Sequence, residues 1–349
     1  ESSDRINRPV MVRPPLDEAY DPRLLLNGHS PESDSGSSDA SKWVAGFCDK
    51  DSFVETLGGW AKTVVTGRAR LGGIPIGIVA TENRTVSKTI PADPASPESG
   101  ETTTTQPGGV WFPDSAFKTA QAIRDLNNEG LPLIIFANWR GFSGGQRDMY
   151  DEVLKFGSDI VDALVSYKQP VFVYIPPEAQ LRGGAWVVVD STINSRVMEM
   201  YAAPTARGGV LEPAGSVSIK FRPKDVKKTA HRIDPLLVAL EERGKHAPKG
   251  SEQAEDVASQ IFAREELVST VFQQVALKFA SLHDTPQRML QKGAIHGIVP
   301  LQRARSFFYW RLQRKLREFE VVRQIQKANP RLSWEEATET LRTWFVEAH

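Results

Sequence analysis

The stretch NWRGFSGGQRD, residues 138–148, places an arginine and two glycines directly after an apolar run. Arg140 carries a guanidinium, which can grip a carboxylate through two parallel hydrogen bonds. Gly144 and Gly145 let a ligand approach the main chain closely, and the free N–H groups at the start of a following helix favour negative charge. These residue types predict an anion-binding turn. The alternatives are a surface ion pair for Arg140 and a simple tight turn for the glycines.

A second glycine pair, Gly183 and Gly184 in LRGGAW, also follows an arginine, Arg182. Two such turns on neighbouring strand ends would stabilise developing oxyanions, and a donor of this kind contributes roughly 3 kcal/mol in enzymes where it has been measured. Either pair could instead do no more than permit a sharp turn.

Other polar residues lie further along the chain. The segment VSIKFRP, residues 217–223, alternates as a strand would, so Lys220 and Arg222 are expected on one face, where a basic pair suits phosphate. A solvated sheet edge is the alternative. Glu212 could orient a polar ligand group or close a local ion pair, and the sequence does not decide between these roles.

Several kinds of catalytic site are not supported by the sequence. None of the six histidines lies between residues 30 and 230, so neither a histidine base, nor a Ser-His-Asp arrangement, nor a metal cluster is expected near these turns. The chain contains neither GxGxxG nor GxxxxGK[ST]. Any proton transfer is therefore expected to use a substrate or cofactor rather than a side chain.

The elements that must position these turns alternate between apolar strands and amphipathic helices. A glycine-punctuated apolar strand is expected over GRARLGGIPIGIVATEN, residues 67–83, followed by a Pro-rich loop. Further strands are expected at 131–137, at PVFVYI and at WVVVD, with a helix from about Gly145 to Tyr167 between the strands at 131–137 and PVFVYI. Nearly continuous apolar strands in this order predict an α/β fold with a buried, mainly parallel sheet, whose ligands gather at the carboxyl ends of its strands. An amphipathic helix is expected around 308–325, with its arginines, Arg305 among them, on the solvated face.

Composition and texture give the remaining boundaries. The chain is 40% apolar and 25% charged, with 43 basic and 43 acidic side chains, so no general attraction to nucleic acid or anionic lipid is expected, and no membrane span. Its single cysteine excludes an internal disulfide.

Because the chain begins at Glu1, it is expected to be a piece of a longer protein. We expect an arm and flexible loop at 1–42, a core subdomain at 43–243, a linker at 244–256 and a helical extension at 257–349.

A family resemblance covers residues from about Asp17 to Phe345. It is carried by FVETLGGWAKTVVTGRARLGGIPIG, IPADPA, SAFKTAQAI, NWRGFSGGQRDMYDEVLKFG, YKQPVFVYIPP, LRGGAWVVVD, GGVLEP, HDTP, ARSFFYWRL and RTWFVE. Together these stretches resemble the C-terminal half of the carboxyltransferase region of eukaryotic acetyl-CoA carboxylase. The segments 29–42 and 244–256 depart from that pattern.

The resemblance implies a crotonase-like fold of repeated ββα units, with a C-terminal helical extension that packs on the core and at a dimer interface. In the family, this half packs against the N subdomain of a second subunit in a homodimer. Biotin, carboxylated on a separate carrier domain, meets acetyl-CoA between them, and malonyl-CoA is formed for fatty acid synthesis. The biotin nitrogen takes the methyl proton. The isolated chain is thus expected to be inactive and its setting cytoplasmic, or plastidic in a photosynthetic source.

The same resemblance implies roles for individual residues. Arg140 would hold the transferred carboxyl group, and amides at the two glycine pairs would form oxyanion holes for the thioester enolate and the biotin ureido oxygen. Lys220 and Arg222 would meet the CoA phosphates. The biotin side of the cavity would be lined by Trp139, Phe142, Val153 and Glu212.

Three alternatives remain. A carboxyltransferase for propionyl-CoA or methylcrotonyl-CoA would differ in the acyl pocket, largely outside these motifs. A crotonase-type hydratase or isomerase would need carboxylate bases where this chain has glycine pairs. A non-catalytic dimerisation fragment would use the helices alone.

Overall fold

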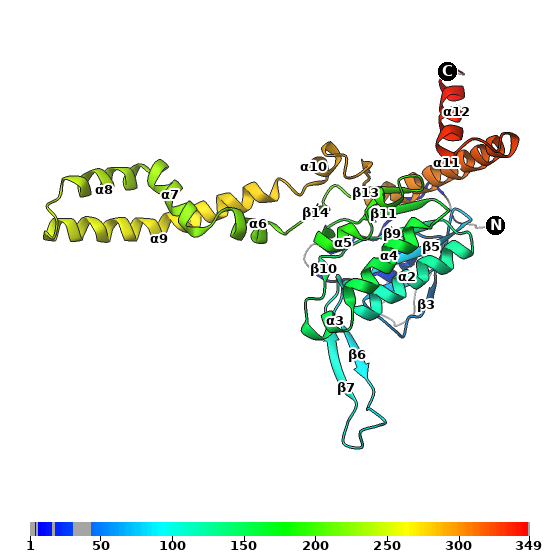
Figure 1. Ribbon diagram of the computed structural model, residues 1–349, viewed down its shortest axis with the longest axis horizontal. Coiled ribbons are helices and arrows are strands. Elements are labelled where there is room, and N and C mark those ends of the chain that lie inside the picture. The colour runs from blue at the N-terminus through cyan, green and yellow to red at the C-terminus, as the bar shows by residue number, and fades with distance from the viewer. Residues whose placement is uncertain (1–3, 5, 16–17, 31–42, 348–349) are drawn as a thin grey trace.

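The computed structural model describes residues 4, 6–15, 18–30 and 43–347, and its centre is a seven-stranded sheet (Figure 1). The strands lie in the order β15-β13-β11-β9-β5-β4-β3. The first five of these run parallel, and β4 and β3 are antiparallel. Their bounds are β3 Val54–Thr56, β4 Val64–Leu71, β5 Ile74–Thr81, β9 Leu133–Phe136, β11 Val171–Ile175, β13 Met198–Ala202 and β15 Gly297–Ile298. The expected parallel core is confirmed.

Helices cover both faces of this sheet, which explains why its inner strands are apolar throughout. On one face, α2 (Pro113–Asn128) lies so close to β5 that a Cβ on Gly77 would meet Leu126 at 2.5 Å, and α4 (Val153–Val165) packs beside α2. On the other face, Phe308 of α11 (Leu301–Ala328) touches Phe172 and Tyr174, with ring centroids 5.6 and 5.4 Å apart.

Two hairpins replace what the sequence suggested were a single strand and a loop. The glycine-punctuated run at 67–83 folds into β4 and β5, because Gly72 and Gly73 adopt φ of +59° and +84° in the turn between them. The Pro-rich segment after it contains β6 (Val86–Ile90) and β7 (Thr102–Gln106), which project from the core (Figure 1).

Two further expectations near the turns are wrong. The helix expected from Gly145 to Tyr167 is divided into α3 (Gln146–Tyr150) and α4, because Glu152 adopts a left-handed φ of 64°. The expected strand WVVVD, residues 186–190, is instead the end of α5 (Gly183–Val187) and the turn after it. The short β12 (Gln180–Arg182) precedes α5, and η2 (Ser191–Asn194) follows the turn. Periodicity alone does not separate a short apolar strand from a buried helical turn.

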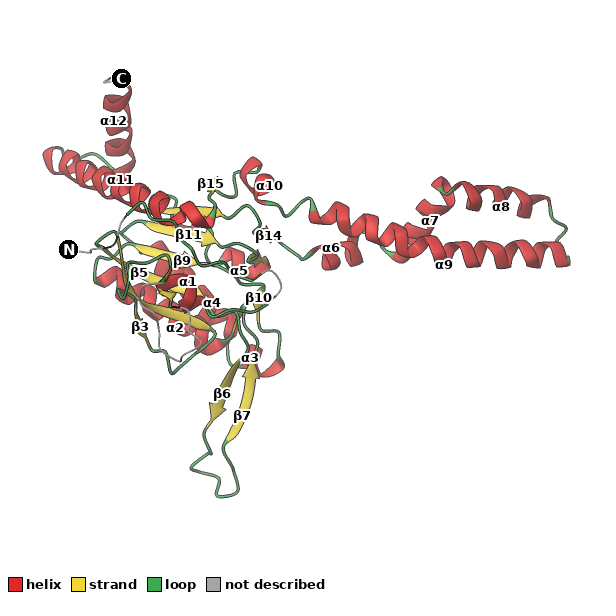
Figure 2. Ribbon diagram, turned by 180° about the vertical axis from the view of Figure 1, so that it is seen from behind, coloured by secondary structure: helices red, strands yellow, loops and turns green. Residues whose placement is uncertain are grey.

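A helical arm extends away from the sheet (Figure 2). It comprises α6 (Pro213–Lys220), α7 (Pro223–Ile233), α8 (Pro235–His246) and α9 (Glu252–Ser281). The strand expected at 217–223 is therefore wrong: Lys220 ends α6 and Arg222 precedes α7, whose first residue is a proline, the residue best suited to that position.

The subdomain limits also differ from those expected. The expected linker at 244–256 is largely helical, and only residues 247–251 connect α8 to α9, which begins after Ser251 caps it by accepting the N–H of Ala254. The arm interrupts the core between β14 (Arg207–Gly209) and α10 (Pro286–Gln291), so residues 213–281 form a unit of their own.

The first part of the chain packs more closely than an arm would. Val10, Leu25 and Leu26 are buried in the main core, and Arg8 donates to the carbonyl oxygens of Gly46 and Cys48 at 2.6 Å. Here α1 (Pro22–Asn27) leads into β1 (Gly28–His29), which pairs with β2 (Val44–Ala45). The expected flexible loop at 31–42 lies outside the described residues.

The C-terminal helices return to the core. The apolar stripe of α11 is buried as expected, and α12 (Trp334–Glu347) packs on α11. Arg305 is an exception to its solvated arginine face, because its side chain is fully buried and donates to Asp49 Oδ1 at 2.7 Å and Phe47 O at 2.9 Å. No helix in the described part of the chain is both long and apolar enough to span a membrane.

His231 fastens the outer part of the arm. Its Nδ1 lies 2.6 Å from Glu241 of α8 and its Nε2 lies 2.6 Å from Glu265 of α9, and these hydrogen bonds, the one with Glu265 foremost, raise the pKa of His231. A neutral imidazole cannot donate hydrogen bonds to both carboxylates, so this pair of hydrogen bonds requires the protonated ring.

We expect the contribution of these His231 hydrogen bonds to the free energy of unfolding to be complete below about pH 6.5, the ordinary histidine pKa. It should disappear as the pH rises through the higher pKa of His231 in the folded chain. Because the site is partly exposed, it is worth about 1 kcal/mol or less. The gap in thermal midpoint between the natural chain and His231→Gln should be larger at pH 6 than at pH 9. An equal gap at both pH values would contradict a stabilising role for protonated His231.

Candidate active site

Two glycine turns lie beyond the carboxyl ends of the central parallel strands. We define the first glycine corner as Arg140–Gly145, which follows β9, and the second glycine corner as Arg182–Gly184, which joins β12 to α5. The first is supported by β10 (Gly141–Phe142), which pairs in parallel with β8 (Val110–Trp111). Both corners thus stand at the edge of the sheet where ligands of such folds bind.

Arg140 is held by its backbone and leaves its guanidinium exposed. Its N–H donates to Gly109 O at 2.8 Å, and its Nη2 lies 3.5 Å from Gly108 O. Among the described residues, no carboxylate lies within ion-pairing distance of this side chain. The cation is therefore free to bind a ligand carboxylate.

The two glycines of the first corner are exposed, and a Cβ on Gly144 would meet nothing within 4 Å. Gly145 immediately precedes α3, and its own N–H makes only a long contact, 3.4 Å, with Ser143 Oγ. Asp148, which sequence reasoning did not single out, accepts a hydrogen bond from Ser143 Oγ at the start of α3. That carboxylate places a negative charge in the first turn of α3, so Arg140 and the exposed backbone at Gly144 are the better anion ligands.

The second corner depends on backbone shape. Gly183 has φ +47°, where other residues are strained, and Val210 O would lie 3.2 Å from a Cβ there. Gly184 is the second residue of α5, and the N–H groups of a helix's first turn have no acceptor within the helix. These features suit an oxyanion.

Arg182 does not contribute to an anion site. Its side chain is only 4% exposed and donates from Nη2 to Asp284 Oδ2 at 2.7 Å and from Nη1 to Leu211 O at 3.2 Å. It therefore attaches the end of the helical arm to the core. The arginine before the second glycine pair is structural, which the sequence alone did not reveal.

Phe142 connects the two corners physically. A Cβ placed on Gly157 of α4 would lie 2.7 Å from its ring, and one on Gly184 would lie 3.3 Å from it. The ring therefore fits between two helices at positions where both lack a side chain. Phe142 as a whole is partly buried.

The other residues expected around the ligand lie at different depths. Trp139 is fully buried and stacks on Trp111 with ring centroids 4.1 Å apart, and Val153 is also fully buried. Glu212 is exposed just before α6. Lys220 and Arg222 are exposed at the base of the arm, on separate helices rather than on one strand.

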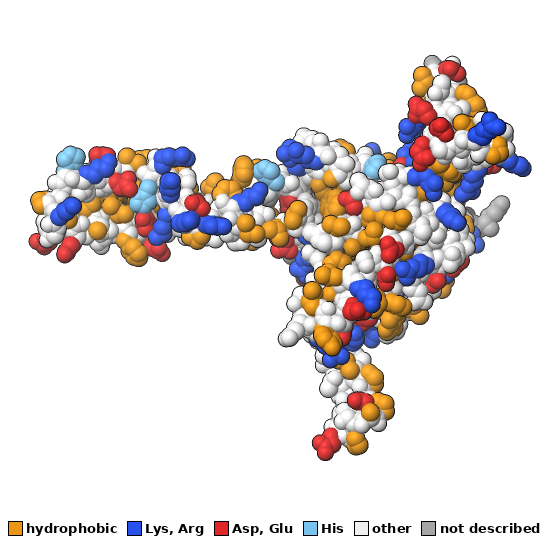
Figure 3. All heavy atoms as spheres, in the orientation of Figure 1, with side chains coloured by type: hydrophobic (Ala, Val, Ile, Leu, Met, Phe, Trp, Pro, Cys, Tyr) orange, Lys and Arg blue, Asp and Glu red, His pale blue; other side chains and the backbone are white. Residues whose placement is uncertain are grey.

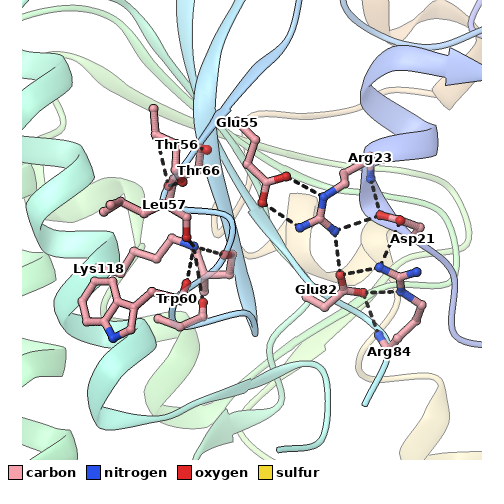
Figure 4. Close-up of polar contacts among 12 residues, drawn as sticks. Asp21, Arg23, Glu55, Thr56, Leu57, Trp60, Thr66, Glu82, Arg84 and Lys118 are labelled. Carbon is pink, nitrogen blue, oxygen red and sulfur yellow. Dashed lines mark hydrogen bonds and ion pairs between the residues drawn. The ribbon is translucent and has the colours of Figure 1, made fainter. Parts of the chain in front are cut away.

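Charged residues at the neighbouring strand end were missed because their partners are distant in sequence. Glu82, just after β5 and 1% exposed, accepts hydrogen bonds from Arg23 and Arg84, and Arg23 also binds both carboxylate oxygens of Glu55 (Figure 4). This network ties the N-terminal segment to the sheet edge that carries the corners.

Lys118 supports the loop on the other side of the same view (Figure 4). Its ammonium donates to the carbonyl oxygens of Leu57, Trp60, Ala61 and Val64, at 2.8–3.4 Å. Burial lowers the pKa of Lys118 to about 8. Four carbonyl acceptors leave this amine no hydrogen bond to offer a substrate, so its role is structural.

No group of three or more histidine, cysteine or acidic side chains that could hold a metal is found within the described ranges. A hollow of about 570 Å³ lies beside the start of α11 and one of about 300 Å³ lies against α2, both away from the corners.

The sequence of this chain matches a known protein family. Residues 3–316 match the model of the carboxyl transferase domain. The chain belongs to this family. It is 54% identical to an acetyl-CoA carboxylase of Dictyostelium discoideum over 346 residues, which are 96% of this chain and 15% of the relative. It is 49% identical to the acetyl-CoA carboxylase of Saccharomyces cerevisiae, covering 99% of this chain and again 15% of the relative.

A solved structure of transcarboxylase 12S matches with a TM-score of 0.58 and 15% identity, covering 90% of this chain and 46% of the other. At this identity the likeness concerns the fold, and the crotonase-like α/β fold is confirmed. This family member spans about one-seventh of the curated relatives, so the activity of the whole protein is a matter for proposal.

Proposed function

We propose that this chain is the C-terminal half of an acetyl-CoA carboxylase carboxyltransferase, which moves a carboxyl group from carboxybiotin to acetyl-CoA and forms malonyl-CoA for fatty acid synthesis. The observation that carries the proposal is the pair of glycine corners at one edge of a carboxyl transferase fold, next to an arginine with no carboxylate partner among the described residues. About 50% identity to relatives of that name supports the choice of substrate.

The residues of this chain suit a reaction in which negative charge moves between oxygens. When bound, carboxybiotin supplies both the carboxyl group and the proton acceptor. Arg140 would hold the carboxyl group through its guanidinium, and backbone N–H groups near Gly144 and Gly184 would stabilise the enolate and ureido oxygens, because fixed dipoles need no reorganisation when charge develops. Phe142 would exclude water between the corners.

The CoA moiety would lie towards the base of the arm. Lys220 and Arg222 are both exposed there, and neither forms an ion pair with the described residues. As cations at the end of α6 and just before α7, they would attract phosphate groups. Trp139, Val153 and Glu212 would support the biotin side, the first two from beneath the surface.

The missing N subdomain of a second subunit would complete the site. Val187, Val210 and Leu211 are exposed beside the second corner, and Phe279 is exposed near the end of α9. Figure 3 shows hydrophobic side chains at the surface where the arm joins the core. Exposed apolar patches mark protein contacts. A homodimer in which the carrier domain delivers biotin between the halves fits this surface, in the cytoplasm or, in a photosynthetic source, the plastid.

The decisive experiment measures carboxyl transfer from malonyl-CoA to free biotin, the reverse reaction, by the chain alone and after mixing with the separately expressed N-terminal half. We expect no activity from the chain alone, and activity in the mixture with acetyl-CoA preferred at least tenfold over propionyl-CoA in the forward direction. A preference for propionyl-CoA or methylcrotonyl-CoA would replace the substrate, and full activity of the chain alone would contradict the proposal.

A further inference from the structure

Asn138, which lies two residues beyond the end of β9, joins three strand ends through its backbone N–H and its side-chain amide. Its backbone N–H donates to Thr81 Oγ1 at 2.9 Å. Its Nδ2 donates to Asn83 Oδ1 at 2.7 Å, and its Oδ1 accepts the backbone N–H of Gln180 at 2.9 Å. One half-buried amide therefore connects the ends of β5 and β9 to the beginning of β12.

The contact with Gln180 leads directly to the second corner. Gln180 is the first residue of β12, and three residues later the chain turns at Gly183 into α5. A parallel bond runs alongside, from Arg182 N to Trp139 O at 2.9 Å. Two residues of the β9 end, Asn138 and Trp139, thus hold the strand that presents the second corner.

The same segment also leads directly into the first corner, which begins at Arg140. Trp139 is immobilised by stacking on Trp111, and Arg140 follows with its N–H bonded to Gly109 O. Gly109 N in turn donates to Glu82 O, one residue before Asn83. Asn138 is therefore the side chain whose hydrogen bonds span from the base of the first corner to the base of the second.

We propose that Asn138 is a positioning residue that fixes the spacing of the two glycine corners for carboxyl transfer. This inference rests on the proposed function. Two oxyanion sites act together only when their separation matches the reacting groups, and a displacement of about 1 Å can lower a rate about a hundredfold. Asn138 acts through the backbone N–H of Gln180 and not on the reacting atoms.

Substitutions of Asn138 should differ in effect according to which of its hydrogen bonds they keep. Leucine has a similar volume but offers neither donor nor acceptor, so it would leave Gln180 N–H and Asn83 Oδ1 unpaired. Aspartate keeps an acceptor for Gln180 N–H, and Asn83 can rotate its own amide to donate to the second oxygen. Asn138→Asp should therefore preserve the link to the second corner that Asn138→Leu removes.

The test uses the complete enzyme carrying Asn138→Leu or Asn138→Asp, with kcat and KM for acetyl-CoA measured beside thermal midpoints. Asn138→Leu is expected to lower kcat about 30- to 100-fold with KM changed less than threefold, and Asn138→Asp to keep at least a third of the natural kcat. Hydrogen–deuterium exchange of residues 178–187 should be faster in the leucine variant alone.

Asn194→Leu is the matched control. Asn194 is also half-buried and its Nδ2 donates to three carbonyl oxygens, but it lies at the opposite edge of the sheet, before β13. It should lower the thermal midpoint as much as Asn138→Leu while kcat stays within twofold. Equal losses of kcat in the two leucine variants, or unchanged exchange at 178–187 in Asn138→Leu, would overturn the positioning role. Absence of carboxyl transfer by the unmutated enzyme would instead overturn the proposed function, and the exchange measurement would still decide the coupling.

Discussion

Arg140→Ala in the complete enzyme is expected to lower kcat for malonyl-CoA formation about a thousandfold. The guanidinium is exposed, is anchored through its backbone to Gly109 and has no carboxylate partner among the described residues, so its charge is available to a ligand. Losing a bidentate, charge-assisted contact to a carboxyl group removes about 4 kcal/mol of transition-state stabilisation, which corresponds to about three orders of magnitude in rate. Steady-state kinetics with saturating acetyl-CoA provides the measurement.

Two variants sharpen this result. Arg140→Lys keeps the charge but not the planar fork, so it should recover no more than a tenth of the natural kcat. Arg124→Ala removes an exposed arginine on the outer side of α2, 3.6 Å from Asp159, and should leave kcat unchanged. Natural turnover in Arg140→Ala would support a purely architectural role for this chain.

The inner strands of the sheet could be predicted because each is a short apolar run that is recognisable from its own residues. Residues 133–136 and 171–175 are short apolar runs bounded by prolines or polar turns, and both became adjacent parallel strands. The β4–β5 hairpin was missed although Gly72 and Gly73 stand at its turn, because apolar residues continue on both sides of them. The reversal becomes visible only in the antiparallel pairing of β4 with β5.

The helical arm shows a different limit. Residues 217–223 alternate in polarity as a strand would, yet they cover the end of α6 and the start of α7, whose N-terminal prolines Pro213 and Pro223 were the better local signal. Lys220 and Arg222 therefore do not share a strand face. Tertiary packing against α9 decides the conformation here, and α9 begins 29 residues further along the chain.

At the site, the sequence predicted the turns but not their supports. Glycine pairs are visible as local features, and both do mark strand-to-helix corners. The partners of Arg182 and Arg305, which are Asp284 and Asp49, lie 102 and 256 residues away, so the same residue type could be read equally well as solvated or as ligand-binding. Buried ion pairs of this kind become visible only in three dimensions.

Gly184→Val is expected to lower kcat about a hundredfold or more while costing about 1 kcal/mol of stability. Gly184 lies in the first turn of α5, and a Cβ there would already lie 3.3 Å from the Phe142 ring, so the two branches of valine must displace that ring or cover the adjacent N–H groups. Loss of one oxyanion donor lowers kcat by about two to three orders of magnitude in other enzymes. Turnover and thermal midpoint of the complete enzyme, measured together, separate the two effects.

Gly100→Val is the matched control, because a Cβ at Gly100 in the β6–β7 hairpin would meet nothing within 4 Å. It should change neither kcat nor the thermal midpoint. Gly157→Val provides the complementary case: it collides with Phe142 from α4, at 2.7 Å, without touching the second corner itself. If the amides of the second corner stabilise charge directly, Gly184→Val lowers kcat further than Gly157→Val does; equal losses would mean that the position of Phe142, rather than backbone N–H donation at Gly184, limits the reaction.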